Sequence, residues 1–297
     1  MNGALDVVAE RIRRQVEGDV LSIGLLARVF ARGKSKSSLR RKLDREPGKY
    51  SVGGKLIQDG VGVRVALYFP DDVSIVEDLL KRKYEYLPDS SSIDNIDEST
   101  FNVVRRNLVF RMKQEDCMEL DRGGFADVPL DTTFEVQLRS MLSEGWHEVE
   151  HDLRYKCKTH WHGHSDLNRA LNGVFATLET SEWSMLKIFD DLALRHYRSG
   201  QWAAMAHARF RIRADAEMLT PMAQYFDGGN GASKALFRAD RRLLFNKLSS
   251  YRIAMPVTIS NFVFLWNHVV YKCPELASLA PSPIQDALSE IDDEVAA

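Results

Sequence analysis

The sequence predicts an α+β fold, in which a mixed β-sheet flanked by helices is followed by an all-helical C-terminal extension. Two observations lead to this prediction. Between residues 57 and 139 the hydrophobic pattern passes from strand to helix and back to strand, an order that suits a mixed sheet. From Asp166 onward, apolar residues recur at helical spacing with few interruptions.

Composition limits the class of protein. A chain of 297 residues suits one domain of about 200 residues with an addition, or two domains. The net charge of −2 gives no global preference for nucleic acid or acidic membranes, so a basic site has to be local. Three cysteines argue against a disulfide framework and fit a reducing cytoplasm. The N-terminus shows no signal peptide, and polar residues interrupt the most apolar stretch, 253–271, so we expect a cytoplasmic protein without a membrane span.

The N-terminal part combines helices with a basic run. Residues 4–30 carry two apolar stripes at helical spacing and are predicted to form two helices. A short helix capped by Ser37 or Ser38 is predicted to end at Leu43. The run 31–43 contains six cations and no acid, a pattern that also fits a plain solvated face: Arg32, Lys34, Lys36, Arg40, Arg41 and Lys42. Several cations on one rigid element are what a triphosphate requires.

The middle of the chain alternates in the manner of a sheet. Residues 57–69 are predicted to form a strand with Asp59 near its entry, followed by a helix over 71–86. Residues 88–100 have turn composition, and residues 107–112 alternate again. In residues 134–139, apolar side chains alternate with an acid, an amide and a guanidinium. The pattern then becomes helical, with a stripe formed by Leu142, Trp146, Val149 and Leu153.

Three segments resemble RelA/SpoT-type alarmone synthetases. ExQxR followed by WxxxEHxxxYK is matched by Glu135, Gln137, Arg139, Trp146, Glu150, His151, Tyr155 and Lys156. RxKSxxSLxRKL is matched by Arg32, Lys34, Ser35, Ser38, Leu39, Arg41, Lys42 and Leu43. DxxGxR is matched by Asp59, Gly62 and Arg64. The resemblance is best over residues 32–156 and implies a nucleotidyltransferase-like synthetase domain.

The resemblance implies a pyrophosphokinase that moves the β,γ-pyrophosphoryl group of ATP to a ribose 3′-hydroxyl of a nucleotide, as in (p)ppGpp synthesis. It implies Mg²⁺ on Asp59 and Glu135, with Glu135 also able to take the acceptor proton. ATP binding is implied for Arg32, Lys34, Ser38, Lys42 and Arg64. Supporting roles are implied for Gln137, Arg139 and His151. No hydrolase segment precedes these motifs, so we expect synthesis alone.

One segment departs from the family pattern. The relatives carry GYxSxH, whose tyrosine stacks on the guanine of the acceptor, whereas the nearest equivalent here is TFNVVR. Phe101 stands where the tyrosine would be and Arg105 where the histidine would be. The acceptor therefore stays open between GDP or GTP, an adenine nucleotide, and the 3′ end of tRNA, the last as in toxin-like relatives. A module that binds nucleotides without catalysis is a further alternative.

Zinc chemistry is a rival hypothesis. His147-Glu148-Val149-Glu150-His151 satisfies HExxH, which on a helix can present two histidines to zinc, with Glu179 or Glu182 as a third ligand. This reading leaves the basic run and Asp59 without a role, so a zinc hydrolase is the least favoured alternative. The Cys/His-rich stretch 157–164 is interpreted as a surface loop.

The predicted domain organisation has three parts. Residues 1–200 form the synthetase domain, 201–280 a helical extension, and 281–297 a loose acidic tail. Helices are expected at about 201–226, 233–251 and 257–271. The extension is expected to bind an antitoxin or to form homo-oligomers.

Overall fold

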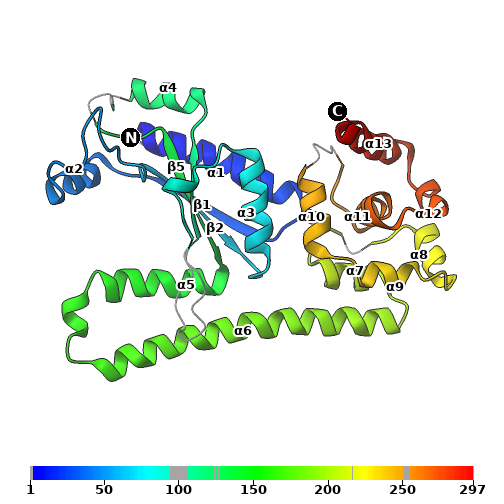
Figure 1. Cartoon of the computed structure of the whole chain (residues 1–297). Coiled ribbons are helices and arrows are strands. Elements are labelled where there is room, and N and C mark those ends of the chain that lie inside the picture. The colour runs from blue at the N-terminus through cyan, green and yellow to red at the C-terminus, as the bar shows by residue number, and fades with distance from the viewer. Residues whose placement is uncertain are drawn as a thin grey trace. The chain divides into compact units, whose positions relative to one another are not determined.

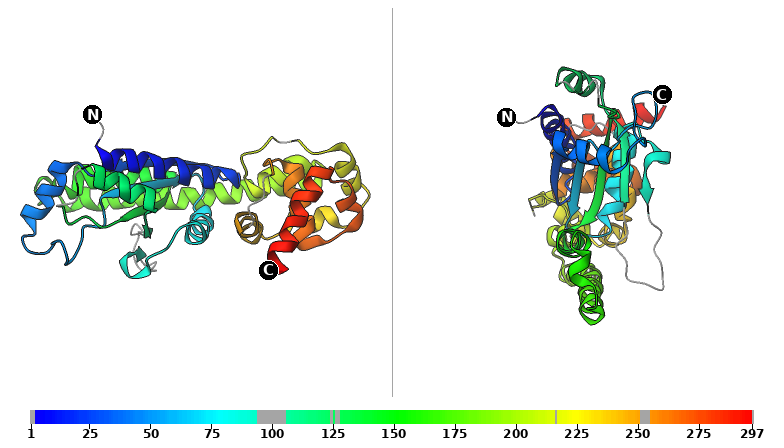
Figure 2. Two further views of the ribbon diagram at one scale, coloured as in Figure 1. Left: turned by 90° about the horizontal axis from the view of Figure 1, so that it is seen from above. Right: turned by 90° about the vertical axis from the view of Figure 1, so that its left-hand side faces the viewer.

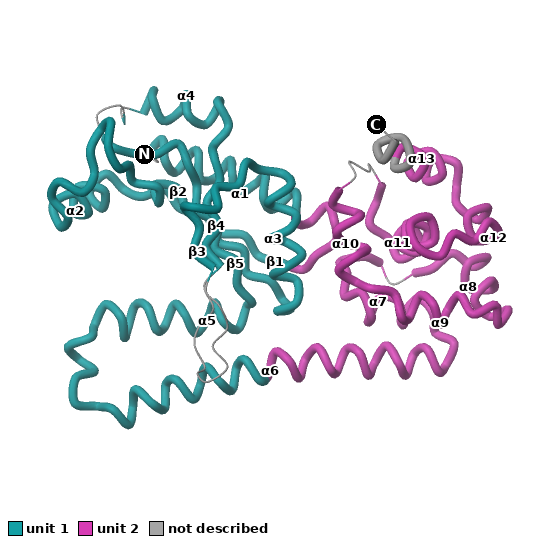
Figure 3. Tube along the Cα trace, in the orientation of Figure 1, with its two compact units in different colours: residues 1–19, 27–180 teal, residues 20–26, 181–297 magenta. Residues whose placement is uncertain are grey.

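The computed structural model describes residues 3–93, 106–123, 125, 128–215, 217–250 and 255–296. They divide into two compact units (Figure 3): unit 1 contains residues 1–19 and 27–180, and unit 2 contains residues 20–26 and 181–297. We predicted a boundary near residue 200, but it falls at residue 180. The 34-residue helix α6 (Ser165–Arg198) contributes residues to both units, so no turn or loop marks the boundary in the sequence.

A five-stranded sheet forms the centre of unit 1, with the strand order β1-β2-β5-β4-β3 (Figure 1). The strands are β1 (Ala27–Gly33), β2 (Val61–Leu67), β3 (Ser92–Ile93), β4 (Arg106–Arg111) and β5 (Thr133–Ser140). β2 and β5 are parallel, whereas the other neighbouring pairs are antiparallel. The predicted mixed sheet and the helical C-terminal part are thereby confirmed.

One face of the sheet is buried in the core. Helices α1 (Ala4–Ser22) and α3 (Asp72–Lys83) pack on this side, and α1 runs beside the strands in Figure 2. Tyr84, at the end of α3, contacts Phe134 of β5 edge-on, with ring centroids 5.5 Å apart, and its hydroxyl donates to Asp19 of α1 at 2.9 Å. A Cβ atom on Gly33 would overlap the backbone of α1, so β1 and α1 approach closely because that residue is a glycine.

The other face of the sheet is polar. Strand alternation places Phe30, Arg64 and Gln137 on this face, because Phe30 pairs with Arg64 across β1 and β2, and Arg64 pairs with Gln137 across β2 and β5. The alternation predicted for residues 134–139 is confirmed, since Phe134, Val136 and Leu138 are buried.

The structure corrects the prediction for residues 4–30. The first predicted helix forms as α1, but the second segment contains β1, because Ala27 and Val29 face the core while their neighbours point outward. In this short second segment the leucines fit the period of a helix as well, so the sequence pattern alone does not distinguish a helix from a strand. Pairing with β2 shows that the segment forms a strand. Helix α2 (Lys36–Arg45) is capped by Ser35 instead of Ser37 or Ser38, and α4 (Gln114–Arg122) had not been predicted.

The helix after β5 also differs from its prediction. α5 (Met141–Val149) continues into a π-helical segment, Glu150–Tyr155. Trp146 is buried as expected, but Val149 and Leu153 are 45% and 61% exposed, so the predicted apolar stripe does not form one buried face. The wider π-helical turn changes the angular spacing of side chains after residue 149. Leu153 therefore no longer lies on the same side of the helix as Trp146.

Unit 2 is helical. Besides its part of α6 it contains α7 (Trp202–Phe210), α8 (Thr220–Asp227), α9 (Ala232–Phe237), α10 (Arg241–Ser250), α11 (Ile259–Trp266), α12 (Pro274–Ser278) and α13 (Ser282–Ala296). The predicted helices 201–226 and 233–251 are each divided in two. The predicted loose tail is wrong, because residues 282–296 form α13, in which Ile284 and Leu288 are buried. In the described part of the chain, no helix combines the length and apolar character that a membrane crossing requires.

Candidate active site

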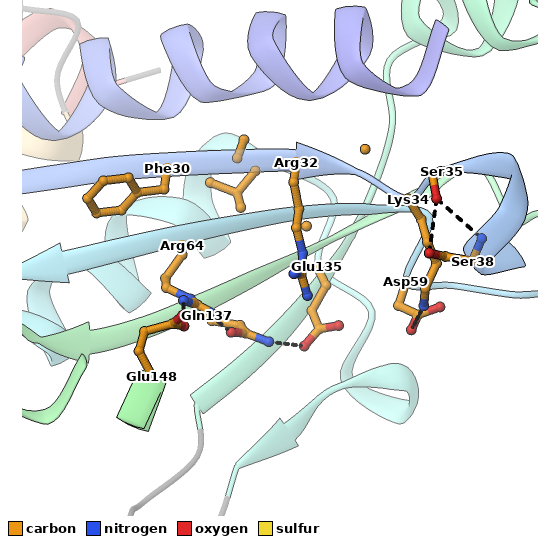
Figure 4. A pocket seen from close by; sticks show the side chains of 14 residues that line it. Phe30, Arg32, Lys34, Ser35, Ser38, Asp59, Arg64, Glu135, Gln137 and Glu148 are labelled. Atoms are coloured by element: carbon orange, nitrogen blue, oxygen red, sulfur yellow. Dashed lines mark hydrogen bonds and ion pairs between the residues drawn. The ribbon is translucent and has the colours of Figure 1, made fainter. Parts of the chain in front are cut away.

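A cavity of about 510 Å³ opens on the polar face of the sheet in unit 1 (Figure 4). It lies where the ends of β1, β2 and β5 meet the start of α2 and the side of α5. Its lining contains cations, carboxylates, hydroxyls and one aromatic ring: Phe30, Ala31, Arg32, Gly33, Lys34, Ser35, Ser38, Asp59, Gly62, Val63, Arg64, Glu135, Gln137 and Glu148. This composition suits a phosphorylated ligand better than an apolar one.

Two lysines hold Asp59. The Lys34 ammonium contacts Asp59 Oδ2 at 2.5 Å, and the Lys42 ammonium contacts Oδ1 at 2.9 Å. The Lys34 backbone N–H also donates to the Gly60 carbonyl at 2.8 Å, which fixes the end of β1 beside the segment that carries Asp59. Both carboxylate oxygens of Asp59 therefore have a cationic partner.

These contacts shift ionisation equilibria. Burial disfavours the ionised form of Asp59, but the hydrogen bonds and positive charges of Lys34 and Lys42 outweigh it, so the pKa of Asp59 lies below its ordinary value. Burial likewise disfavours the charged form of Lys42, yet Asp59 raises the pKa of Lys42 above its ordinary value. The carboxylate and the ammonium therefore both stay charged around neutral pH.

The N-terminus of α2 borders the same cavity. Ser35 caps the helix by accepting from the Ser38 backbone N–H at 3.2 Å, and its hydroxyl also contacts the Ser38 hydroxyl at 3.0 Å. The first turn of α2 carries no acidic side chain. Free backbone N–H groups and the positive end of the helix dipole favour an anion at this position.

Side chains from two strands form a connected row along the cavity floor. The Arg64 Nε–H donates to Gln137 Oε1 at 3.3 Å, and the Gln137 amide donates to Glu135 Oε1 at 3.1 Å. In Figure 4 the Glu135 carboxylate lies on the same side of the sheet as Asp59. Asp59 and Glu135 are 76 positions apart in the sequence. They face one cavity because Asp59 shortly precedes β2, and β2 is the neighbour of β5 in the sheet.

Arg64 is also held from α5. Its guanidinium forms ion pairs with Glu144 and Glu148. Glu144 in turn pairs with Arg139 at 3.1 Å, and these two side chains are 12% and 5% exposed. Burial is the main reason that the pKa of Arg139 lies below its ordinary value. Arg139 and Glu144 therefore anchor α5 to β5 beneath the cavity and position Arg64.

We expect Glu144→Gln to destabilise the protein by about 3 kcal/mol, because it leaves the buried Arg139 guanidinium without its carboxylate. Glu148→Gln is the matched control, since Glu148 also pairs with Arg64 but its side chain is 50% exposed. Urea unfolding of both variants checks the expectation. Equal free energies of unfolding for the two variants would contradict it.

The two histidines of the HExxH sequence lie side by side on the helix, with ring centroids 6.0 Å apart. Glu148, the general base in the zinc hypothesis, points to Arg64 and lines the cavity instead. Among the described residues, no group of three or more His, Cys, Asp or Glu side chains is arranged to hold a metal ion. The structure thus gives His147 and His151 no third zinc ligand within the part of the chain that it describes.

His147 makes stability depend on pH. Burial, followed by the charges of Arg139 and Arg64, lowers the pKa of His147 to about 4 from an ordinary 6.5. The unfolded chain then binds more protons than the folded one between these values, so stability is lost as pH falls from about 6.5 to about 4. With allowance for partial exposure, we expect a loss of about 1 kcal/mol between pH 7 and pH 5. Urea unfolding at both pH values should show a smaller loss for His147→Gln, and an unchanged loss for the exposed control His160→Gln.

The structure brings most predicted site residues together. Seven line the cavity: Arg32, Lys34, Ser38, Asp59, Arg64, Glu135 and Gln137. Lys42 joins them through Asp59, and Arg139 lies beneath the cavity. His151 does not line it, being 40% exposed at its side chain and in contact with Asp152. Phe101 lies outside the described residues. Sequence reasoning missed Phe30 as a lining residue, because the second predicted helix hid the alternation of β1.

One part of the chain matches a known protein family. Residues 31–160 match the family model described as a region found in RelA / SpoT proteins. This segment contains β2, β5, α2 and α5, and thus nearly all of the cavity lining. This segment is similar to RelA/SpoT proteins, and the resemblance seen in the sequence is confirmed for it. A comparison with curated proteins gives no match.

Several solved structures are similar to this chain. The small alarmone synthetase 1 from Bacillus subtilis is 18% identical with a TM-score of 0.44, covering 62% of this chain and 92% of its own. A GTP pyrophosphokinase family protein from Streptococcus pneumoniae is 18% identical with a TM-score of 0.43, covering 62% and 88%. The small alarmone synthetase 2 from Bacillus subtilis is 21% identical with a TM-score of 0.40, covering 62% and 90%. Because these sequence identities and TM-scores are low, we base the functional assignment on the family match of residues 31–160.

Proposed function

We propose that unit 1 transfers the pyrophosphoryl group of ATP to a ribose 3′-hydroxyl of a nucleotide acceptor and releases AMP. One observation carries the proposal: within a RelA/SpoT-type region, Asp59 and Glu135 face one cavity together with a cluster of cations. Phosphoryl-type transfer depends mainly on in-line positioning and on neutralisation of phosphate charge, and the cations of the cavity support the second of these requirements.

In this proposal, the donor phosphates bind at the end of the cavity that the N-terminus of α2 borders. Lys34 and Lys42 leave Asp59 and turn to the phosphate oxygens, while Arg32 offers a forked guanidinium from β1. The α2 N-terminus adds backbone N–H donors beside Ser35 and Ser38. The released Asp59 carboxylate is then free for a different partner.

The donor set fits magnesium. Mg²⁺ prefers oxygen ligands and is commonly bound by one or two carboxylates together with waters and substrate phosphates. Asp59 and Glu135 provide two carboxylates from separate segments at one cavity. These residues would hold the ion, which when bound neutralises phosphate charge. Glu135, kept in place by the Gln137 amide, would also accept the proton of the attacking hydroxyl.

An acceptor panel tests the proposal. The purified chain is incubated with magnesium and ATP labelled at the β position, together with GDP or GTP, an adenine nucleotide, or uncharged tRNA. We expect label on one acceptor class and an equal amount of AMP. Label on tRNA would assign the toxin-like alternative, with the same donor chemistry. ATP binding without AMP formation for every acceptor would instead establish a non-catalytic nucleotide-binding module.

Metal dependence separates this proposal from zinc hydrolysis. We expect activity to require magnesium and the purified protein to contain less than stoichiometric zinc. A zinc-containing protein that loses activity with a zinc-selective chelator, and regains it with zinc alone, would favour the HExxH alternative.

A further inference from the structure

Phe30 occupies an unusual position for a large apolar side chain. It is 53% exposed on the polar face of β1, directly opposite Arg64 of β2, and it lines the cavity. Single exposed apolar residues are ordinary on protein surfaces, so exposure alone means little. What distinguishes Phe30 is that its ring faces a cavity whose other side chains are mainly charged or polar.

The cavity has two chemically different ends (Figure 4). Lys34, Ser35 and Ser38 lie at one end with Asp59, and Phe30 lies at the other. Phe30 lies on β1 and Lys34 directly follows the last residue of that strand, Gly33, so the two are four residues apart, which corresponds to about 13 Å at the usual strand rise. A cationic end and an aromatic end at such a separation suit the phosphates and the base of one nucleoside triphosphate.

Groups around Phe30 complete a base-binding surface. Arg32 follows two residues later on the same face of β1, so the face of its guanidinium can stack against a ring that rests on Phe30 while its N–H groups donate to the phosphates. Gln137 and Glu148 lie at the same end of the cavity and provide hydrogen-bonding groups for the edge of a base. Aromatic side chains bind bases by stacking, since every base has a π-face.

We propose that Phe30 is the platform on which the adenine base of the donor ATP stacks. This inference rests on the proposed function, which places the triphosphate at the end of the cavity near Lys34. Phe30 precedes the matched segment 31–160, so its assignment comes from the structure and not from the family match.

Two ligands separate base binding from phosphate binding. Calorimetric titration with the ATP analogue AMPCPP probes the whole site, whereas inorganic tripolyphosphate probes the cationic end alone. We expect Phe30→Ala to weaken AMPCPP binding about tenfold and to leave tripolyphosphate binding unchanged. Phe30→Trp should retain AMPCPP binding, while Phe30→Leu should behave like Phe30→Ala, because it is apolar but has no ring. The control Ile93→Ala removes a 41% exposed apolar side chain from β3 and should change neither affinity.

Several outcomes would overturn the assignment. They are an unchanged AMPCPP affinity in Phe30→Ala, an equal loss for both ligands, or an effect confined to the KM of the acceptor. Failure of the proposed function looks different: AMPCPP binding would depend on Phe30 while no acceptor yielded AMP. Unfolding curves of each variant verify that the exposed substitution leaves the fold intact.

Discussion

Asp59→Asn is expected to reduce AMP formation from ATP by about 100-fold or more. The substitution removes one of the two carboxylates proposed to hold magnesium, and it also removes the negative charge between Lys34 and Lys42. Both ammonium groups then have no anionic partner at this position, so we expect binding of metal-free ATP to be retained or strengthened. We therefore expect Asp59→Asn to lose turnover while it retains ATP binding.

The fold of the Asp59→Asn variant should survive. Asp59 is 38% exposed at its side chain, and ion pairs of this kind contribute about 1 kcal/mol or less to stability. Asp121→Asn, an exposed substitution on α4, is the matched control and should leave activity unchanged. The proposal for Asp59 fails if its variant keeps wild-type turnover, or if it loses ATP binding and turnover in equal measure.

Glu135→Gln is expected to lower kcat by about 100-fold, with little change in the KM for ATP. Glutamine retains the shape of the side chain and can still accept from the Gln137 amide, but it can neither take a proton nor offer a charged ligand. The measurement is steady-state AMP formation with the acceptor that the panel identifies.

Glu115→Gln on α4 serves as the control for Glu135, because it makes the same chemical change at an exposed position. A Glu135→Gln effect confined to the KM for ATP would show that this carboxylate contributes to donor binding and not to the transfer step. In that case Glu135 would have to be removed from the proposed reaction.

Much of the sheet could be predicted because alternation is a strong signal where one face is buried. Phe134, Val136 and Leu138 define the core face of β5, and this alone determines that Glu135 and Gln137 point to the cavity. β1 was missed because four leucine and valine positions fit a helical period, and only pairing with β2 distinguishes the two structures. Phe30 was lost from the candidate site for the same reason.

Features that depend on tertiary contacts were beyond pattern reasoning. The ion pairs of Arg64 with Glu144 and Glu148 join β2 to α5 across 80 positions or more of sequence. No local period encodes such pairs. The π-helical segment Glu150–Tyr155 and the unit boundary inside α6 are likewise invisible, since composition does not change at either place.

The most direct test of the central claim is an experimental structure of the chain with magnesium and AMPCPP. We expect a triphosphate held by Lys34 and Lys42, an ion at Asp59 and Glu135, and the adenine on Phe30. A nucleotide bound outside this cavity would contradict it. So would a zinc ion between His147 and His151 with the cavity left empty.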